Sequence, residues 1–360
     1  MRRFPVLAVA LLSLFGNAGS ARPAWEAGRP DSELPAGVGA SYSYPAGRWS
    51  LEYRYERLSF GGLRDGEKDL VPAQVLADFP AVMTEMDAET HVLRARYALG
   101  DRWTVFSLFS FALRSMEVRT REGRKVRLDS EGAGDWHTGL SRFLYENGPH
   151  ELHLEAGLGL PTGSIDEKDR WIDGARRKLP YPLQLGSGTF DLRPAVVYLG
   201  MQGPWSWGLY PAGTLRLGKN SAGYDLGDTL EVSGWAARKW TPWLSTSLRF
   251  SAEIRPNIRG RDADLDPASL PAADPDRMGG ERVDLLFGFQ LSRARGFLGG
   301  HRLGLEAGLP VHESLEGPQL ERDWRLYLAW RKTFGEPVPQ APKRMARPQP
   351  STTSPATKSP

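Results

Sequence analysis

Asp135, His137 and Ser141 occupy alternating positions of one segment, so in a β-strand their side chains would share a face. An acid, a histidine and a serine are the groups of a hydrolytic triad, in which the histidine takes a proton from the serine nucleophile. Residues four apart on a strand are roughly 13 Å apart, however, which is too far for that transfer. The spacing therefore favours polar residues that line a barrel. It names no catalytic residue and leaves an outer-membrane barrel hydrolase as an alternative.

Three aspartates, Asp262, Asp264 and Asp266, follow the spacing at the start of a calcium-binding loop. Such a loop needs glycine at its sixth position and glutamate at its twelfth, where this chain has Pro267 and Ala273. The six histidines are scattered and cysteine is absent, so the spacing shows no cluster of metal ligands. The sequence predicts no metal site and no cofactor, and leaves open a weak cation site in this stretch.

Charged side chains recur at every second residue of segments whose other residues are apolar. In the first such segment, Glu52 and Arg54 alternate with Leu51, Tyr53 and Tyr55, which is the period of a β-strand. A soluble core could not accept so many charges, because each unpaired buried charge costs several kcal/mol. The charged faces are therefore predicted to line the lumen of a barrel, where they can pair or stay hydrated. The lumen-lining candidates are Glu52, Arg54, Glu56, Arg94, Arg96, His153, Glu155, Asp191, Arg193, Arg249, Glu253, Asp284, Arg302, Glu306 and Arg325, and Arg331 continues the pattern.

Twelve segments are predicted to be the strands of an all-β, antiparallel transmembrane β-barrel, some with less regular alternation. Their apolar faces would contact outer-membrane lipid. The mean hydropathy is −0.42, and no apolar stretch after residue 21 is long enough for a transmembrane helix. A soluble β-sandwich is the alternative. The predicted strands cover residues 49–56, 91–99, 102–119, 134–145, 152–160, 189–200, 205–218, 230–240, 244–255, 283–291, 303–309 and 324–330.

Short and long connections alternate along the chain. Tight turns are predicted at 100–101, 146–149, 201–204 and 241–242, with a somewhat longer one at 292–301. Polar stretches lie between them at 61–90, 120–133, 161–188, 219–228, 256–281 and 311–322. Bacterial outer-membrane barrels have short periplasmic turns and long extracellular loops, whereas a sandwich gives no reason for the alternation. The pattern predicts an outer-membrane location, with both ends of the barrel in the periplasm.

The two ends of the chain differ from the part between them. Residues 1–21 combine a basic start, a short apolar run and small residues, as secretory signal peptides do. We assign 22–46 to an N-terminal periplasmic segment, 47–334 to the barrel, and 335–360, rich in Pro, Ser, Thr and Lys, to a disordered tail. The formal net charge of +3 comes from the terminal segments. A nucleic-acid-binding protein would cluster basic residues, so nucleic acid is not an expected partner.

Two motifs bracket the stretch 161–188, one at its start and one at its end. They contain Pro161, Thr162 and Gly163, and then Gly186, Ser187 and Gly188. Such residues form turns, and as a pair they could fix one external loop across the barrel mouth. Together with residues 157–166, 179–192, 47–55, 272–277 and 313–321, they make the chain from 47 to 334 similar to the outer-membrane β-barrel family of meta-pathway phenol-degradation transporters.

This resemblance implies an outer-membrane protein with a transport role, and it brings no catalytic residues with it. With the lumen charges, it predicts a channel or transporter for a small solute, aromatic and hydrophobic compounds included. Twelve strands enclose a narrower interior than the sixteen or so of a porin, which favours a restricted path. The alternatives are a closed structural barrel with a partner-binding or metal-tolerance role, and the barrel hydrolase.

Overall fold

The computed structural model describes residues 28–40, 46–293 and 298–335. The predicted signal peptide, 1–21, and the predicted tail from residue 336 onward lie outside these ranges. The described elements are β-strands, apart from one α-helix and three short 3-10 helices. None of the described helices is long and apolar enough to cross a membrane.

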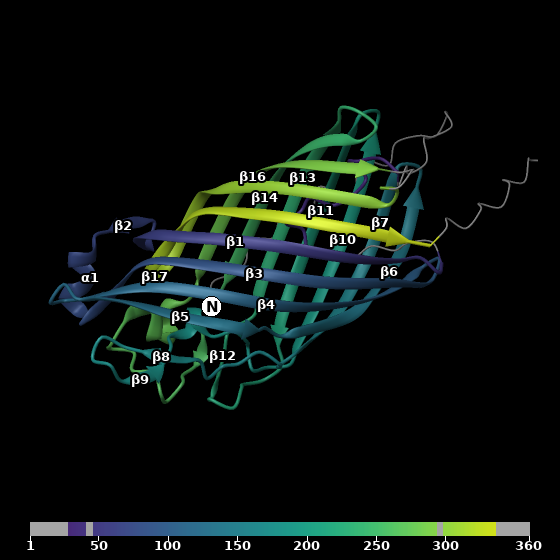
Figure 1. Cartoon of the computed structure of the whole chain (residues 1–360). Helices are drawn as coiled ribbons and strands as arrows, with labels where there is room; N and C mark the ends of the chain where they lie inside the picture. The colour runs from purple at the N-terminus through teal and green to yellow at the C-terminus, as the bar shows by residue number, and fades with distance from the viewer. Residues whose placement is uncertain (1–27, 41–45, 294–297, 336–360) are drawn as a thin grey trace, which may run out of the picture.

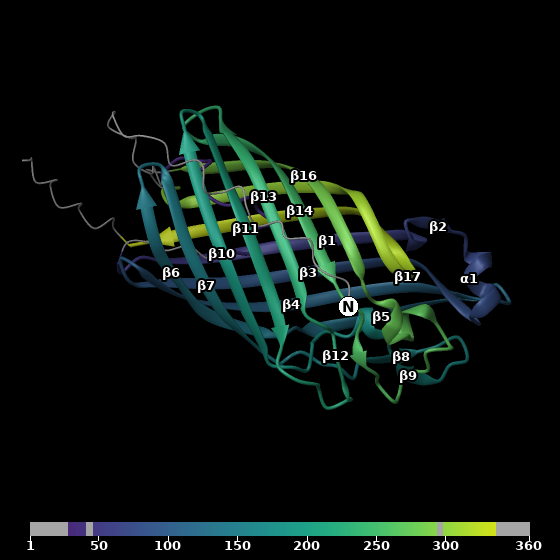
Figure 2. The ribbon, with the colours of Figure 1, turned by 180° about the vertical axis from the view of Figure 1, so that it is seen from behind.

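Thirteen strands form one antiparallel sheet, and eleven of them close into a ring (Figures 1 and 2). The last strand pairs with the first, with Trp49 opposite Phe334, and this closure removes the edges that an open sheet would expose. The all-β, antiparallel barrel predicted from the sequence is confirmed. In chain order, the ring contains β1 (Trp49–Gly66), β3 (Ala81–Gly100), β4 (Trp103–Thr120), β6 (Trp136–Asn147), β7 (His150–Leu160), β10 (Asp191–Gln202), β11 (Trp205–Arg216), β13 (Thr229–Lys239), β14 (Leu244–Arg255), β16 (Gly280–Arg293) and β17 (His301–Phe334).

The ring has eleven strand elements where the sequence predicted twelve separate strands. The difference lies in the last two predicted strands, 303–309 and 324–330, which form one element, β17, together with the stretch between them. The part of β17 up to Leu315 pairs with β16, and the part from Leu315 onward pairs with β1. Residues 311–322 were expected to form a loop. They pair with the extended ends of β16 and β1. Leu315 pairs with Gly280 and Gly66 at one end of the ring, whereas His301 pairs with Arg293 and Phe334 with Trp49 at the other, so the chain reverses direction within β17 and its two halves run antiparallel.

Other strands also continue past their predicted ends. β1 runs to Gly66 and β3 begins at Ala81, although 61–90 was expected to be a loop. The stretch 120–133 contains β5 (Lys125–Ala133), which pairs with the C-terminal half of β4. A further short strand, β2 (Lys68–Leu70), pairs with the C-terminal end of β1. Backbone hydrogen bonds hold these extensions, so they form without the alternation of apolar residues that marks the predicted parts of the strands.

The short connections gather at one end of the ring, the turn end, and the longer ones at the other, the loop end (Figure 1). The turn-end connections are 101–102, 148–149, 203–204 and 240–243, and the end of β16 at Arg293 and the start of β17 at His301 also lie at this end. Besides β2 and β5, the loop-end connections contain α1 (Pro72–Asp78), β8 (Lys168–Arg170), β9 (Arg176–Lys178), η1 (Tyr181–Leu183), β12 (Tyr224–Asp225), β15 (Arg259–Gly260), η2 (Pro271–Ala273) and η3 (Pro275–Arg277).

Apolar side chains at the loop end pack into a core of their own. Leu179, Leu183 and Leu270 from the long connections join Val82 and Val118 from the strands, and all five are buried. The long connections therefore fold back onto the strands instead of extending into solvent.

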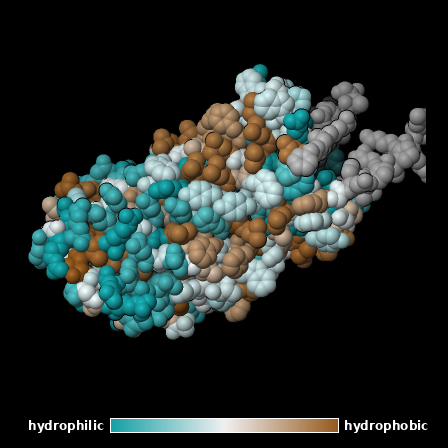
Figure 3. All heavy atoms as spheres, viewed as in Figure 1, coloured by the Kyte–Doolittle hydropathy of each residue, from teal (hydrophilic) through white to brown (hydrophobic). Residues whose placement is uncertain are grey.

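The wall of the ring carries apolar side chains outside and polar side chains inside. Leu248 and Leu305 face outward and are 46% and 41% exposed, while their chain neighbours Arg249 and Glu306 are 0% exposed. Figure 3 shows hydrophobic residues gathered over the strands and hydrophilic residues over the loop end. A soluble sandwich would bury its apolar faces, so the β-sandwich alternative is wrong. The distribution is that of a transmembrane barrel, whose outer face meets lipid.

Candidate functional site

The predicted lumen residues all lie on the inward faces of the strands. Glu52, Arg94, Arg96, His153, Glu155, Asp191, Arg249, Asp284 and Glu306 are buried there, and Arg54, Glu56, Glu253, Arg302 and Arg325 are partly buried. Arg193 is exposed although Asp191 and Ala195, on the same face of β10, are buried. Because its side chain shares the inward face, Arg193 is exposed to the interior of the ring.

A fully buried ion pair crosses the inner wall between β14 and β17. Arg249 Nε and Nη2 donate to the two carboxylate oxygens of Glu306 at 2.8 and 2.9 Å. The strand between them, β16, has Gly288 at this level, directly paired with Glu306. A Cβ on Gly288 would lie 2.6 Å from Ser247 Oγ and 3.5 Å from Glu306 Cγ, so a side chain here would compete for the space beside the ion pair.

A second group of ion pairs lies nearer the loop end. Asp284 accepts hydrogen bonds from Arg322 and Arg325, each at 2.6 Å, and Arg325 also lies 3.5 Å from Glu56. Arg322 lies 3.6 Å from Glu253. Carboxylates in this part of the wall are thus shared among arginines, which compensates for the loss of their hydration.

Residues 28–40, which we call the plug, lie inside the ring. Ser206 Oγ on β11 donates to the carbonyl of Asp31, Gln290 on β16 donates to that of Leu34, and Arg96 on β3 donates to that of Ala40. These strands come from different sides of the ring, so the plug crosses the lumen. The sequence assigned residues 22–46 to an N-terminal periplasmic segment, and residues 28–40 of that segment lie inside the ring.

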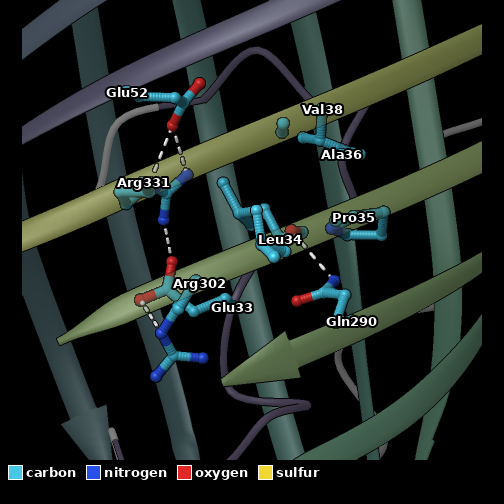
Figure 4. Close-up of a pocket in the computed structure, with 12 residues that line it drawn as sticks. Glu33, Leu34, Pro35, Ala36, Val38, Glu52, Gln290, Arg302 and Arg331 are labelled. Carbon is cyan, nitrogen blue, oxygen red and sulfur yellow. Dashed lines mark hydrogen bonds and ion pairs between the residues drawn. The ribbon is translucent and has the colours of Figure 1, made fainter. Parts of the chain in front are cut away.

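Ion pairs fasten the plug to β17 near the turn end (Figure 4). Glu33 forms a short ion pair with Arg331 and lies 3.2 Å from Arg302 Nε. Arg331 also bonds Glu52, which links the plug to β1. The cavity left between the plug and this part of the wall is about 30 Å³, room for no more than about two waters. The plug therefore fits closely against this side of the ring.

The middle of the plug requires a residue without a side chain. Gly37 N–H donates to Glu306 at 2.8 Å, and a Cβ at Gly37 would lie 2.2 Å from Arg249 Nη2 and 2.6 Å from the ring of Tyr327. Two residues further on, a Cβ at Gly39 would meet its nearest neighbour at 3.7 Å, an ordinary contact. The plug is thus seated on the Arg249–Glu306 ion pair at one glycine and loosely enclosed at the next.

An apolar strip of the lumen receives the other side of the plug. Leu34, Val38 and Ala40 pack with Val197 and Leu199 of β10, in a buried cluster that also contains Tyr210 and Trp235. Sequence reasoning missed the plug because residues 28–40 show neither the strand nor the helix period. The signal that it could have used is the run of small residues at 36–40, Ala-Gly-Val-Gly-Ala, which suits a chain threaded through a narrow space.

Asp135 joins the two loop motifs. Its carboxylate accepts the Gly163 N–H at 2.9 Å, the Ser187 N–H at 2.8 Å and the Ser187 hydroxyl at 2.7 Å. Gly163 and Gly186 lie so close that a Cβ on either would fall within 2.7 Å of the other residue. Thr162 bonds the backbone at 134 and 136, and Gly188 has a φ of 68° that favours glycine. Pro161 lies just after β7, so the motifs fix both ends of the connection 161–188.

The candidate triad residues are not connected. Asp135 is committed to the loop motifs, while His137 Nδ1 and Ser141 Oγ are buried without a hydrogen-bond partner among the described residues. The three side chains share a face, as expected, but form no nucleophile–base pair.

The first aspartate of the stretch 262–266 forms an ion pair with a lysine side chain. Lys178 Nζ lies 2.6 Å from the buried carboxylate of Asp262, beside a recess of about 360 Å³ at the loop end. The Tyr181 hydroxyl accepts the Asp262 N–H at 3.0 Å, and burial raises the pKa of this tyrosine. Within the described ranges, no three metal-ligating side chains come together.

Comparison with known proteins bears on the fold. No family model and no curated protein matches this chain. Among solved structures, the COG4313 outer membrane channel from Pseudomonas putida F1 is similar with a TM-score of 0.55 at 16% identity, over 82% of this chain and 99% of that one. The P. putida toluene transporter TodX gives a TM-score of 0.41 at 10% identity, over 81% of this chain and 91% of TodX. The ring, its apolar outer face and polar inner face, and the first of these similarities agree, and the chain has the fold of an outer-membrane β-barrel.

Proposed function

We propose that this chain is an outer-membrane channel for a small solute and that the plug closes it at rest. The observation that carries the proposal is the wall itself, with apolar side chains toward lipid and charged ones toward a lumen in which Arg193 meets solvent. The turn end would face the periplasm, because short connections mark that side of outer-membrane barrels. The resemblance of the loop motifs to meta-pathway phenol-degradation transporters supports a small organic solute.

The plug is built to leave without disturbing the wall. Residues 28–40 belong to none of the sheet's strands, and the ring of strand pairs is continuous without them. Wall side chains hold the plug by its backbone carbonyls at Asp31, Leu34 and Ala40 and by the ion pairs of Glu33 with Arg331 and Arg302. Only a few apolar side chains of the plug are buried. Release therefore breaks side-chain contacts and leaves the backbone ladder of the barrel intact.

A closed structural barrel is the second candidate, because the plug and the loop-end core occupy the two ends of the ring. The two functions predict opposite results in planar lipid bilayers. In the channel, Gly37→Val cannot be accommodated beside Arg249, Glu306 and Tyr327, so the plug leaves its seat and conductance rises well above that of the unchanged protein. Gly39→Ala is the matched control, since its added methyl meets only ordinary contacts.

Folding of each variant is checked by the heat-dependent mobility of barrels on gels. A folded Gly37→Val protein that shows no discrete conductance would remove the channel and leave the structural barrel. Equal conductance of the unchanged protein and Gly37→Val would remove the plug from the mechanism while keeping the channel.

A further inference from the structure

We propose that the solute is a small organic anion, which moves along six arginines of the inner wall, Arg54, Arg94, Arg114, Arg193, Arg216 and Arg255. This set, the basic path, leads from the loop end to the plug. The inference rests on the channel function proposed above and names the class of its solute.

Half of the arginines in the basic path have no carboxylate of the described residues at ion-pairing distance. Glu52 alone is shared by three arginines, at 3.0 Å from Arg96, 3.8 Å from Arg94, and in contact with Arg331. Asp191 and Glu253 pair with Arg216 and Arg255. Within the described part of the chain, Arg54, Arg114 and Arg193 have no carboxylate within 4.0 Å. Three further acids act at longer range: Glu155 on Arg94, Asp135 on Arg216, and Glu231, which accepts a hydrogen bond from Ser233, on Tyr210.

Several N–H groups of the basic path have no acceptor. The Nε atoms of Arg54, Arg94 and Arg114 and Nη1 of Arg54 are buried without a hydrogen-bond partner among the described residues. A buried donor without an acceptor costs free energy, which an oxygen-bearing ligand would recover. The wall therefore presents hydrogen-bond donors for which the described residues supply no acceptor, and a solute with oxygen atoms could bind them.

The arginines follow one another through the lumen. At the loop end, Arg114 Nη1 donates to the carbonyl of Pro182 at 2.5 Å, which places the path beneath the connection 161–188. Arg216 on β11 pairs with Asp191 on β10, and Arg193 follows two residues later on the same inward face of β10. Arg255 acts electrostatically on both Arg114 and Arg216.

At its other end the path reaches the plug. A Cβ at Gly39 of the plug would lie 3.7 Å from Arg94 Nη2 and 3.9 Å from Arg54 Nη1, so both guanidinium groups border the plug. Arg193 and Arg94 both act electrostatically on His137 and Tyr210. Arg94 Nη1 donates to the carbonyl of Ala40 at 3.2 Å. An anion that leaves one guanidinium is thus already attracted by the next, up to the point where the plug closes the way.

The chemistry of the guanidinium group selects the solute. Its planar donors match the two oxygens of a carboxylate, and it is less strongly hydrated than an ammonium group. Guanidinium groups that no carboxylate pairs with attract anions and repel cations. A solute with one carboxylate on a small organic body would use both the fork geometry and the charge.

The test measures charge selectivity of the opened channel. Full-length Gly37→Val protein is placed in a planar bilayer under a potassium chloride gradient, and the reversal potential gives the chloride-to-potassium permeability ratio. Arg193→Gln is the informative second change, because Arg193 is exposed and has no ion pair, so its loss leaves the wall folded. Arg142→Gln is the matched control, since Arg142 lies outside the ring over Trp103, 5.0 Å from the ring centroid.

The inference expects an anion-selective pore, and Arg193→Gln should lower the permeability ratio at least about twofold, as expected for one unit charge near a narrow hydrated path. Benzoate should reduce the chloride current, less so in Arg193→Gln, while Arg142→Gln changes neither property. A pore that is unselective or prefers potassium, or in which both substitutions act alike, overturns the anion path and leaves the channel standing. Absence of conductance in folded Gly37→Val protein overturns the channel, and the path with it.

Discussion

Replacing Glu306 by glutamine tests the buried ion pair on which the plug rests. The change keeps the shape of the side chain but removes the charge that faces Arg249 Nε and Nη2 at 2.8 and 2.9 Å. Arg249 is 0% exposed, and it would retain the Ser233 hydroxyl at 3.0 Å as an acceptor. Breaking a buried pair by removing one partner costs about 3 to 5 kcal/mol, and the remaining acceptor places the expected loss of unfolding free energy near the lower figure.

The assay follows the folded fraction against urea by gel mobility, after reconstitution in lipid. A double variant, Arg249→Met with Glu306→Leu, is the control, because removing both charges together avoids an unpaired one and should cost much less than the sum of the single changes. A loss below about 1 kcal/mol for Glu306→Gln would mean that water already solvates Arg249, and the reasoning from burial would fail.

Three further outcomes are expected. Asp135→Asn weakens the hydrogen bonds that hold both ends of the connection 161–188, and bonds to a charged group contribute about 1.5 to 3 kcal/mol. Trypsin should therefore cut after Arg177 sooner, while the ring stays folded. Unchanged cleavage would contradict the role of Asp135. Leu248→Arg should cost about 2 to 4 kcal/mol if this position faces the middle of a bilayer, whereas Val71→Arg at the loop end should be nearly neutral; equal effects would argue against lipid at Leu248. Lys178→Met leaves the buried Asp262 carboxylate without its ammonium partner, so hydrogen exchange at 262–266 should accelerate. Protection equal to that of the unchanged protein would refute a stabilising role for the Lys178–Asp262 ion pair.

The sequence predicted the part of the fold that side-chain alternation controls. Leu248, Arg249 and Phe250 already showed which face is apolar, because a strand in a thin wall must expose one face to lipid and the other to the lumen. The positions of the tight turns followed from Gly, Pro and Asp for the same local reason.

Features that depend on pairing between strands distant in the chain could not be predicted from the sequence. The extension of β3 back to Ala81 and the extension of both halves of β17 into 311–322 depend on backbone bonds to neighbours, and these bonds accept almost any side chain. The same holds for ion pairs: alternation placed Arg249 and Glu306 on the inner face, but only the glycine at 288 on the intervening strand shows that they can meet. The plug was missed because its contacts come from the walls that surround it.

The plug belongs to the same chain as the wall, joined to β1 through residues 41–48. A tether this short keeps the blocking segment at an effective concentration of about millimolar at its own seat. Reclosure is thus a first-order event, with a rate that does not depend on how many copies the membrane holds, and a free peptide with the sequence of the plug would compete only at similarly high concentration.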